Sequence, residues 1–343
     1  MKIIHIESGL GNQMLSFCEY LAIKSVNPND DCFIETIVYD IPECNEVICQ
    51  WNGYELDKIF RLEAPDIKSA FTPTQWESLM SFIRESRFWE KNWNYPVHFT
   101  QAFGKVGLEV KNMRGDFEAP GAPYMTPLSK PGYKKTFLFQ YLNYIRRKYI
   151  KRPSTPASPE LFIHTDDNVF TGQQLTFKNK GTGIERIDKE IRESFTFPAL
   201  TSKADMSLAE EVQSCQSIAI HARRGDMLSY NFDCYHGGYF KRAVKYLKES
   251  IASPRFYIFC DPGSVEWAKH NSKVFGLDFR KDHITFVDWN KGETSWRDMQ
   301  LMSLCKHQVI TRSSFGWWGA YLNSYKDKIT CSPDDITNTT HHF

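Results

Sequence analysis

The chain has 343 residues, of which 41% are hydrophobic and 24% charged, and its formal net charge is +1. This length is enough for two domains of ordinary globular composition. Proteins that bind a polyanion carry a large basic excess, so the near-neutral charge excludes nucleic acid as the main partner. No run approaches the roughly 18 apolar residues of a membrane span, and the short apolar start Met1–Ile6 predicts a strand rather than a signal peptide. We therefore expect a cytoplasmic protein whose nine scattered cysteines are thiols.

The N-terminal half begins with the pattern of an α/β domain. Residues Lys2–Ile6 predict a strand, Asn12–Val26 a helix, and the segment near Phe33–Tyr39 a second strand. From about residues 65–160 the chain is rich in Trp, Phe, Tyr, Pro and basic residues without a clear period, so we interpret this segment as an insertion. Periodicity returns in two segments, Leu161–His164 and Ile184–Phe195.

The C-terminal half alternates between short apolar strands and amphipathic helices. The predicted strands are Ser217–His221, Phe256–Cys260, His283–Val287, Gln308–Thr311 and, as the last one, Lys328–Cys331. The predicted helices are Tyr239–Ile251, Val265–Asn271, Trp296–Cys305 and Phe315–Asn323, preceded by one that a capping box at Ser207–Glu210 opens. Strands of about five residues between helices indicate a parallel sheet. We therefore predict two Rossmann-like α/β domains, residues 1–200 with the insertion and residues 201–343.

The segment His221–Asp226 is the strongest candidate for a site, because it follows a strand at the edge where parallel sheets bind ligands. Side chains alternate along a strand, so we expect His221 and Arg223 on one face and Arg224 on the other. An imidazole beside a forked guanidinium suits an anion such as phosphate. We expect Arg224 and Asp226 to pair across the turn, with Gly225 at a positive φ. A surface Arg–Asp cluster without a ligand is the alternative.

The segment Asp298–Trp318 predicts a helix, a strand, a turn and a second helix. Ser313 and Ser314 fall where the second helix begins, and the unpaired backbone N–H groups there form a natural phosphate site. Ordinary N-capping by serine is the alternative. Trp317 and Trp318 are expected in the core rather than on a surface that stacks against a base or sugar.

A glycine turn follows the first predicted strand and contains Gly9, Gly11, Asn12 and Gln13. Met14 stands where a dinucleotide-binding fingerprint needs its third glycine, so the turn is weak support for NAD or FAD. A tight turn without a ligand is the alternative. The sequence also lacks a phosphate-binding P-loop, the nucleophile and zinc-protease motifs, and the Asp-x-Asp triplet of metal-dependent sugar transferases. We therefore expect neither a cofactor nor a metal.

Together these segments resemble glycosyltransferase family 11, the α-1,2-fucosyltransferases, in their bacterial form. The matching segments occur in the order of the family and cover about half of the chain. They are Gly9–Met14, Asn52–Phe60, His221–Asp226, Phe286–Asp288 with Asn290–Gly292, and Asp298–Asn323.

The resemblance implies a GT-B architecture, in which two Rossmann-like domains face each other across a cleft and the C-terminal one binds the donor GDP-fucose. It implies that Arg223 engages the β-phosphate and that His221 and Asp298 contact the guanine nucleotide. Ser313 and Ser314, with Phe315 beside them, would complete the donor site. The N-terminal domain would then lie on the acceptor side.

The resemblance further implies inverting transfer of L-fucose to the 2-hydroxyl of a terminal β-galactoside in a glycan, as in polysaccharide biosynthesis. Arg223, Asp226 and His236 are the candidate catalytic residues, and Glu7 is a further candidate for the base. Another GDP-sugar transferase, a non-catalytic sugar-nucleotide-binding protein and an NAD-dependent oxidoreductase stay open as alternatives. Peripheral attachment at the inner face of a membrane is also left open.

Overall fold

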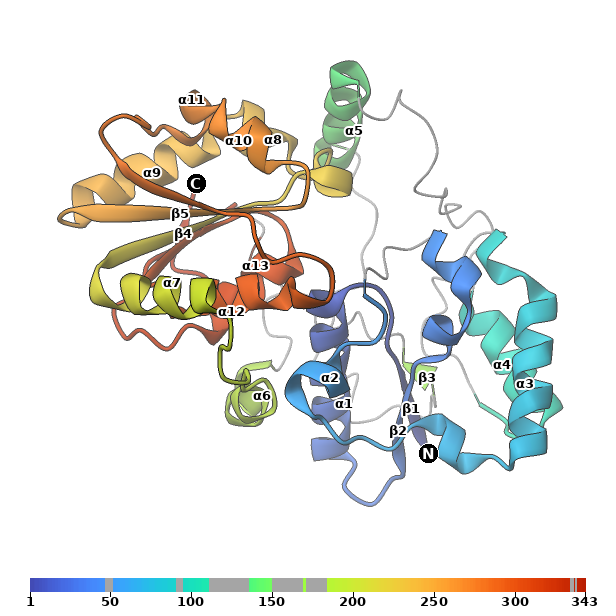
Figure 1. The fold of residues 1–343 in the computed structure, drawn as a ribbon. Helices are drawn as coiled ribbons and strands as arrows, with labels where there is room; N and C mark the ends of the chain where they lie inside the picture. The colour runs from blue at the N-terminus through green and yellow to red at the C-terminus, as the bar shows by residue number, and fades with distance from the viewer. Residues whose placement is uncertain are drawn as a thin grey trace. The chain divides into compact units, whose positions relative to one another are not determined.

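The computed structural model describes residues 1–46, 52–90, 95–110, 136–149, 169–170, 184–333, 336 and 338–343. The chain divides into two compact units (Figure 1). The first comprises Met1–Lys130 and Pro156–Thr196, and the second comprises Pro131–Thr155 and Phe197–Phe343. The strand expected at Leu161–His164 lies outside the described residues.

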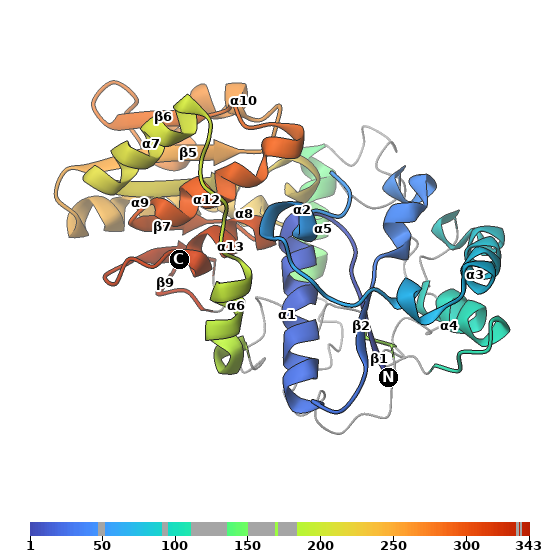
Figure 2. The same ribbon diagram turned by 60° about the horizontal axis from the view of Figure 1, so that its bottom comes forward.

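The first unit contains a parallel three-stranded sheet in the order β2-β1-β3. Its strands are β1 (Lys2–His5), β2 (Cys32–Glu35) and β3 (Val169–Phe170). Its α-helices are α1 (Leu10–Val26), α2 (Leu56–Phe60), α3 (Pro73–Ser86), α4 (Tyr95–Lys105) and α6 (Asp188–Ser194). In both views α1 lies on one side of β1 and β2, and α3 and α4 lie on the other (Figures 1 and 2).

The second unit contains a six-stranded sheet in the order β6-β5-β4-β7-β8-β9, and all of its pairs are parallel. Its strands are β4 (Gln216–Ala222), β5 (Pro254–Cys260), β6 (His283–Val287), β7 (His307–Ile310), β8 (Thr330–Ser332) and β9 (His341–His342). The chain starts in the middle, proceeds to one edge and then returns to fill the other side. This is the strand order of doubly wound nucleotide-binding sheets.

Helices cover both faces of this second sheet. The helices of this unit are α5 (Phe137–Tyr149), which packs against α8, α7 (Lys203–Ser214), α8 (Phe232–His236), α9 (Tyr239–Ser250), α10 (Val265–Lys269), α11 (Ser272–Phe275), α12 (Trp296–Leu304) and α13 (Ser314–Leu322). Figure 1 shows α8 to α11 on one face and α7, α12 and α13 on the other. The side chains of Ile218, Ile220 and Ala222 enter the core formed with α9, because alternate residues of β4 point to the same face.

The prediction of α/β units with parallel sheets is therefore confirmed, and most predicted elements of the second half agree with the structure to within about two residues. The arrangement of two domains across a cleft, and their roles toward acceptor and donor, stay predictions.

Four details of the sequence prediction are wrong. The strand expected near Phe33–Tyr39 ends at Glu35, and a 3₁₀ turn over Ile37–Asp40 follows. The capping box at Ser207–Glu210 is not used, because α7 begins earlier, where the Ser202 hydroxyl accepts from the backbone N–H of Asp205. The helix expected at Val265–Asn271 divides into α10 and α11, and β9 follows the strand expected to be last.

Candidate functional site

The centre of the second sheet positions the segment His221–Asp226. The strand β4 is first in the order of winding, and β7 is the strand at which the winding reverses, so the two form the switch point of the sheet. Ligands of doubly wound sheets bind in the crevice outside the carboxyl ends of such a pair. The segment leaves β4 at that end, and Thr311–Ser314 leaves β7 beside it.

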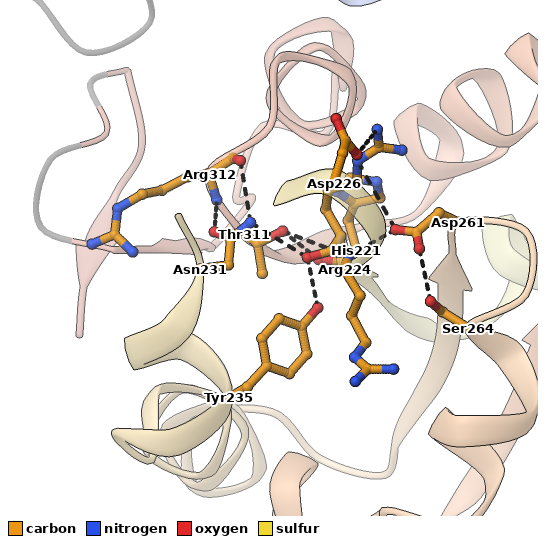
Figure 3. Close-up of polar contacts among 10 residues, drawn as sticks. His221, Arg224, Asp226, Asn231, Tyr235, Asp261, Ser264, Thr311 and Arg312 are labelled. Atoms are coloured by element: carbon orange, nitrogen blue, oxygen red, sulfur yellow. Dashed lines mark hydrogen bonds and ion pairs between the residues drawn. The ribbon is translucent and has the colours of Figure 1, made fainter. Parts of the chain in front are cut away.

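Side-chain hydrogen bonds fix the backbone at this switch point (Figure 3). The hydroxyl of Thr311, which is completely buried, donates to the carbonyl of His221 and accepts from the N–H of Arg223, both at 3.2 Å. The Tyr235 hydroxyl donates to the carbonyl of Arg223 at 2.8 Å. Asn231 accepts from the N–H of Arg312 at 2.8 Å and donates to the same Arg223 carbonyl at 3.3 Å. The turns after β4 and β7 are thus held together through α8.

The Arg223 guanidinium lies between two carboxylates. Its Nη2 donates to Asp226 Oδ1 at 2.7 Å, and its Nε is 3.9 Å from Asp261 Oδ1. The predicted pair of Arg224 with Asp226 is therefore wrong. Gly225 has a φ of 33°, as expected, and this turn brings the Asp226 carboxylate back to Arg223, three residues before it.

Arg224 points to the opposite face of the sheet, as the alternation along β4 predicts. Its guanidinium carbon is 3.6 Å from the centre of the Trp267 ring, and the Tyr235 ring lies at 5.6 Å. Its backbone N–H donates to Asp261 Oδ1 at 2.7 Å, while Ser264 donates to Asp261 Oδ2. Arg224 therefore stabilises the packing of α8 and α10 and leaves Arg223 as the guanidinium of the site.

His221 is buried against the start of α13. A Cβ atom added to Gly316 would be 2.2 Å from His221 Nδ1, so this glycine is required for the contact. Burial, helped by the positive charge of Arg223, lowers the pKa of His221 to about 4, so the imidazole is neutral at physiological pH. Its Nδ1 is buried and makes no hydrogen bond within the described part of the chain. The Phe315 ring lies 5.9 Å from the imidazole.

Asp298 lies in the first turn of α12 and accepts a hydrogen bond from Asn290 Nδ2 at 2.9 Å. Burial, with the charges of Asp205 and Asp288, raises its pKa to about 7, although the Asn290 hydrogen bond lowers it. Burial and the charge of Asp261, with a smaller contribution from the charge of Asp298, raise the pKa of Cys260, which ends β5. Asp298 thus belongs to the same edge of the sheet as His221 and Arg223.

Ser313 and Ser314 lie at the start of α13, as predicted. Ser313 occupies the N-cap position with extended backbone and its hydroxyl does not cap the helix, so the reading of an ordinary serine cap is not supported. The first N–H groups of a helix have no partner within the helix, and they give this end a positive potential. Trp317 and Trp318 are 1% and 0% exposed, which confirms that they belong to the core.

The glycine turn belongs to the first unit, whereas the residues described so far belong to the second. Gly9 is the N-cap of α1, and Asn12 donates to the hydroxyl of Ser8. Gln13 is completely buried and joins two loops, since it donates to the carbonyls of Ser8 and Gly53 and accepts from the N–H of Glu55. In the described structure Gln13 and Asn12 therefore organise the turn.

His236 ends α8 and is exposed. Its ring packs against Phe232, with ring centres 4.5 Å apart, and against Phe137 of α5. Burial and the charge of Arg224 lower its pKa below the usual value of 6.5. The assignment of a catalytic role to His236 stays a prediction, as does that to Asp226.

Two carboxylates near the site, Asp261 and Asp205, were not predicted from the sequence. Asp261 contacts both arginines, and only its position directly after a predicted strand beside β4 could have indicated it. Asp205 is completely buried, and it accepts from Trp289 and Asn290, which orients the loop before Asp298. No local pattern indicates this contact, because its partners are more than eighty residues apart in the chain.

A buried ionic cluster in the first unit was also missed. His5 Nδ1 is hydrogen-bonded to Glu35, and its Nε2 lies 3.5 Å from Glu7 Oε2. Burial alone would lower the pKa of His5, but the charge and hydrogen bond of Glu35, with support from Glu7, raise it to about 9. Glu7, a candidate base, is therefore already engaged by an imidazolium.

No group of three or more His, Cys, Asp or Glu side chains that could hold a metal occurs within the described residues. The same residues include no helix that is both long and apolar enough to cross a bilayer.

The second unit is thus a doubly wound α/β fold that places the Arg223 guanidinium at the carboxyl edge of its sheet. Residues 186–342 match the sequence model of glycosyl transferase family 11. This match to somewhat less than half of the chain bears out the resemblance inferred from its motifs.

Two curated relatives are similar to this chain over part of their length. The α-1,2-colitosyltransferase of Escherichia coli is 34% identical over 164 residues, which are 46% of this chain and 53% of that protein. The galactoside α-(1,2)-fucosyltransferase 1 of Homo sapiens is 28% identical over 110 residues, which are 31% of this chain and 28% of that protein. The matches thus span about half or less of the length of these relatives. Among solved structures, the fucosyltransferase NodZ from Bradyrhizobium covers 98% of this chain and 96% of its own, with a TM-score of 0.45 and 12% identity.

Proposed function

We propose that this protein transfers L-fucose from GDP-β-L-fucose to the 2-hydroxyl of a terminal β-galactoside, by an inverting reaction that needs no metal. The match of residues 186–342 to the sequence model of glycosyl transferase family 11 supports the class of reaction. The α-1,2 linkage in the names of two relatives supports the hydroxyl that is modified. The observation that carries the proposal is the Arg223 guanidinium, held by Asp226 and Asp261 at the switch point of the sheet.

The phosphates of the donor would bind between Arg223 and the start of α13. A planar guanidinium matches two phosphate oxygens at once, and it stays charged at any physiological pH. The N–H groups at Ser313–Ser314 supply further donors with a favourable dipole. Asp226 already orients Arg223 in the described structure. Binding would therefore cost little additional side-chain entropy.

Asp298 and His221 would recognise the guanine nucleotide. A carboxylate can accept from guanine N1–H and N2–H₂ together, whereas adenine offers no such pair of donors. The neutral imidazole of His221 adds no positive charge to the site, so Arg223 dominates the attraction of the diphosphate.

Inversion requires a single in-line displacement through a state with oxocarbenium character. Arg223 and the helix end would stabilise the charge that develops on departing GDP. The acceptor proton needs a route, for which Asp226 and His236 are the candidates in the second unit and Glu7 is the candidate in the first.

A second candidate donor is an activated colitose, which the similarity to the colitosyltransferase favours. Turnover with GDP-fucose, GDP-colitose and GDP-mannose on a panel of β-galactosides, followed by NMR of the product linkage, would separate these donors. GDP binding without turnover on any acceptor would instead favour a sugar-nucleotide-binding protein.

Replacement of Arg223 by Ala tests the proposal. We expect transfer to fall by about 10²–10³, because one preorganised charge-stabilising donor is lost. Arg280→Ala is the matched control, since Arg280 is exposed elsewhere in the same unit. Initial rates with GDP-fucose and circular dichroism spectra should be measured for both variants. Near-normal transfer by a folded Arg223→Ala protein would exclude the proposed role.

A further inference from the structure

Asp205, in the first turn of α7, is a completely buried carboxylate that hydrogen-bond donors surround. Its Oδ1 accepts from Trp289 Nε1 at 2.8 Å and from Asn290 Nδ2 at 3.0 Å. Its Oδ2 accepts from Arg297 Nη1 at 3.4 Å. All three partners present N–H groups, so this position requires an acceptor at both of its oxygens.

The side chain of Asn290 joins Asp205 to Asp298. Its amide nitrogen, which carries two hydrogens, is 3.0 Å from Asp205 Oδ1 and 2.9 Å from Asp298 Oδ1. One hydrogen therefore goes to each carboxylate. Asn290 is only 7% exposed, so the bridge is shielded from water, whereas Asp298 is partly exposed. The orientation of Asp298 is thus set from α7 through one amide group.

Stability alone would not favour this arrangement of charges. Two carboxylates share a single amide, and their like charges repel each other. Burial, with the charges of Asp205 and Asp288, raises the pKa of Asp298 to about 7, against the effect of the Asn290 hydrogen bond. A well-packed apolar group in place of Asp205 would avoid the repulsion. Carboxylates that are kept under such conditions are typical of functional sites.

We propose that Asp205 is a positioning residue for recognition of the nucleotide base. Through Asn290 it holds the Asp298 carboxylate in the orientation in which its oxygens meet the N1–H and N2–H₂ edge of guanine. Asp205 itself touches no part of the donor, because the protein encloses its side chain. A binding group that is held in this way discriminates more sharply, since it cannot turn to suit another base. The inference rests on the proposed contact between Asp298 and guanine.

Asp205→Asn tests this role, because it keeps the shape of the side chain and replaces one acceptor by an NH₂ group. Either orientation of the new amide turns that donor towards Arg297 or towards Trp289 and Asn290, so contacts are lost. The wild type should bind GDP at least about tenfold more tightly than inosine diphosphate, which lacks the N2 amino group and one hydrogen bond to a charged acceptor. In Asp205→Asn this ratio should fall to about threefold or less, since Asp298 is no longer held. Calorimetric titration at pH 8 measures these dissociation constants.

Asp282→Asn is the matched control for the loss of a carboxylate. Asp282 accepts from Lys248 at 2.6 Å and lies directly before β6, at the amino end of the strands. This variant should keep the wild-type ratio. A general loss of structure would weaken the binding of both nucleotides alike, so only a change in their ratio reports the orientation of Asp298.

The pH profile gives a second readout of the same contact. The ionisable groups that act on Asp298 are Asp205 of α7, Asp288 in the loop after β6 and Cys260 at the end of β5. Asp205→Asn removes one negative charge and so lowers the pKa of Asp298. The dissociation constant of GDP-fucose should then differ by less than about threefold between pH 6 and pH 8, against about tenfold for the wild type.

A second variant tests the bridge without a change at Asp205. Asn290→Ala removes the amide and leaves Asp205 with Trp289 and Arg297. It should reduce the preference for GDP over inosine diphosphate as far as Asp205→Asn does. The double variant should lose no more than either single one, because both residues act along one path.

The outcomes separate this inference from the donor assignment. A folded Asp205→Asn or Asn290→Ala protein that keeps the wild-type preference for GDP would overturn the inference alone. Additive losses in the double variant, or a wild-type pH profile in Asp205→Asn, would also overturn it. Equal binding of GDP and inosine diphosphate by the wild type would instead show that Asp298 does not contact the guanine edge, and the inference would fail together with that assignment.

Discussion

At the scale of single residues, burial shifts the pKa values of the two candidate nucleotide contacts in opposite directions. It lowers the pKa of His221 to about 4 and raises that of Asp298 to about 7. The physical cause is the same, because desolvation disfavours the charged form of either group. The imidazole is therefore neutral over the whole physiological range, whereas the Asp298 carboxyl titrates within it.

This difference predicts that donor affinity depends on pH. Only the ionised carboxylate of Asp298 accepts two hydrogen bonds from guanine, and below pH 7 an increasing fraction of the free protein is protonated there. We expect the dissociation constant of GDP-fucose to be about tenfold larger at pH 6 than at pH 8, which is the change for one pH unit below the pKa. The diphosphate diester of this donor does not titrate in that range. Calorimetric titration at pH 6, 7 and 8 measures the effect.

Asp298→Asn provides the control, because an amide carries no titratable proton in this range. Its affinity should be weak and independent of pH. An equal wild-type dissociation constant at pH 6 and pH 8 would show that Asp298 does not contact the base as a carboxylate.

At the scale of elements, the site depends on how closely α13 approaches β4. His221 points from β4 to the face covered by α7, α12 and α13, and Gly316 in the first turn of α13 leaves room for its ring. Gly319, one turn later, faces Met302 of α12 at a similarly short distance. These two glycines let α13 pack tightly, although glycine within a helix is otherwise unfavourable.

Gly316→Ala should therefore destabilise the protein and disturb the site together. The added methyl group overlaps His221 Nδ1, and overpacking of this kind costs about 1–3 kcal/mol. Urea unfolding should show the loss of stability, and GDP binding should weaken.

Gly104→Ala is the matched control, because Gly104 lies in α4 with no atom within 4 Å of an added Cβ. That variant should be stabilised by about 0.5–1 kcal/mol, the usual difference between alanine and glycine in a helix. A Gly316→Ala protein as stable as the wild type would mean that β4 and α13 separate readily.

At the scale of the whole molecule, the net charge of +1 hides strong local contrasts. The second unit places a guanidinium between two carboxylates at the carboxyl edge of its sheet. In the proposed reaction the positive charge opposite the diphosphate comes from Arg223 and a helix end, so no ion is required there.

We therefore expect transfer to persist when divalent ions are removed. Initial rates with GDP-fucose should stay within about twofold after treatment with EDTA, because Arg223 and the helix end already supply the stabilising charge. Rates after re-addition of Mg²⁺ and Mn²⁺ serve as the control. A loss of activity with EDTA that either ion restores would contradict the metal-independent mechanism.

The amino-acid sequence by itself determined the alternation of strands and helices in the second half, because that signal is local: short β-branched and aromatic runs followed by helical periodicity. It also indicated His221, Arg223 and Asp298 as candidate site residues, since their motifs are contiguous. It did less well in the first half, where short helices and 3₁₀ turns carry little periodicity.

Only the tertiary structure decided the strand order, the pairing of Asp226 with Arg223 rather than with Arg224, and the contacts of Asp261, Asp205 and Gly316. The turn at Gly225 brings Asp226 to Arg223 through a backbone angle that composition does not specify. The other contacts join residues far apart in the chain, for example Gly316 and His221, which meet only because β4 and β7 are neighbours in the sheet. Long-range proximity follows from packing, and packing is a property of the folded whole.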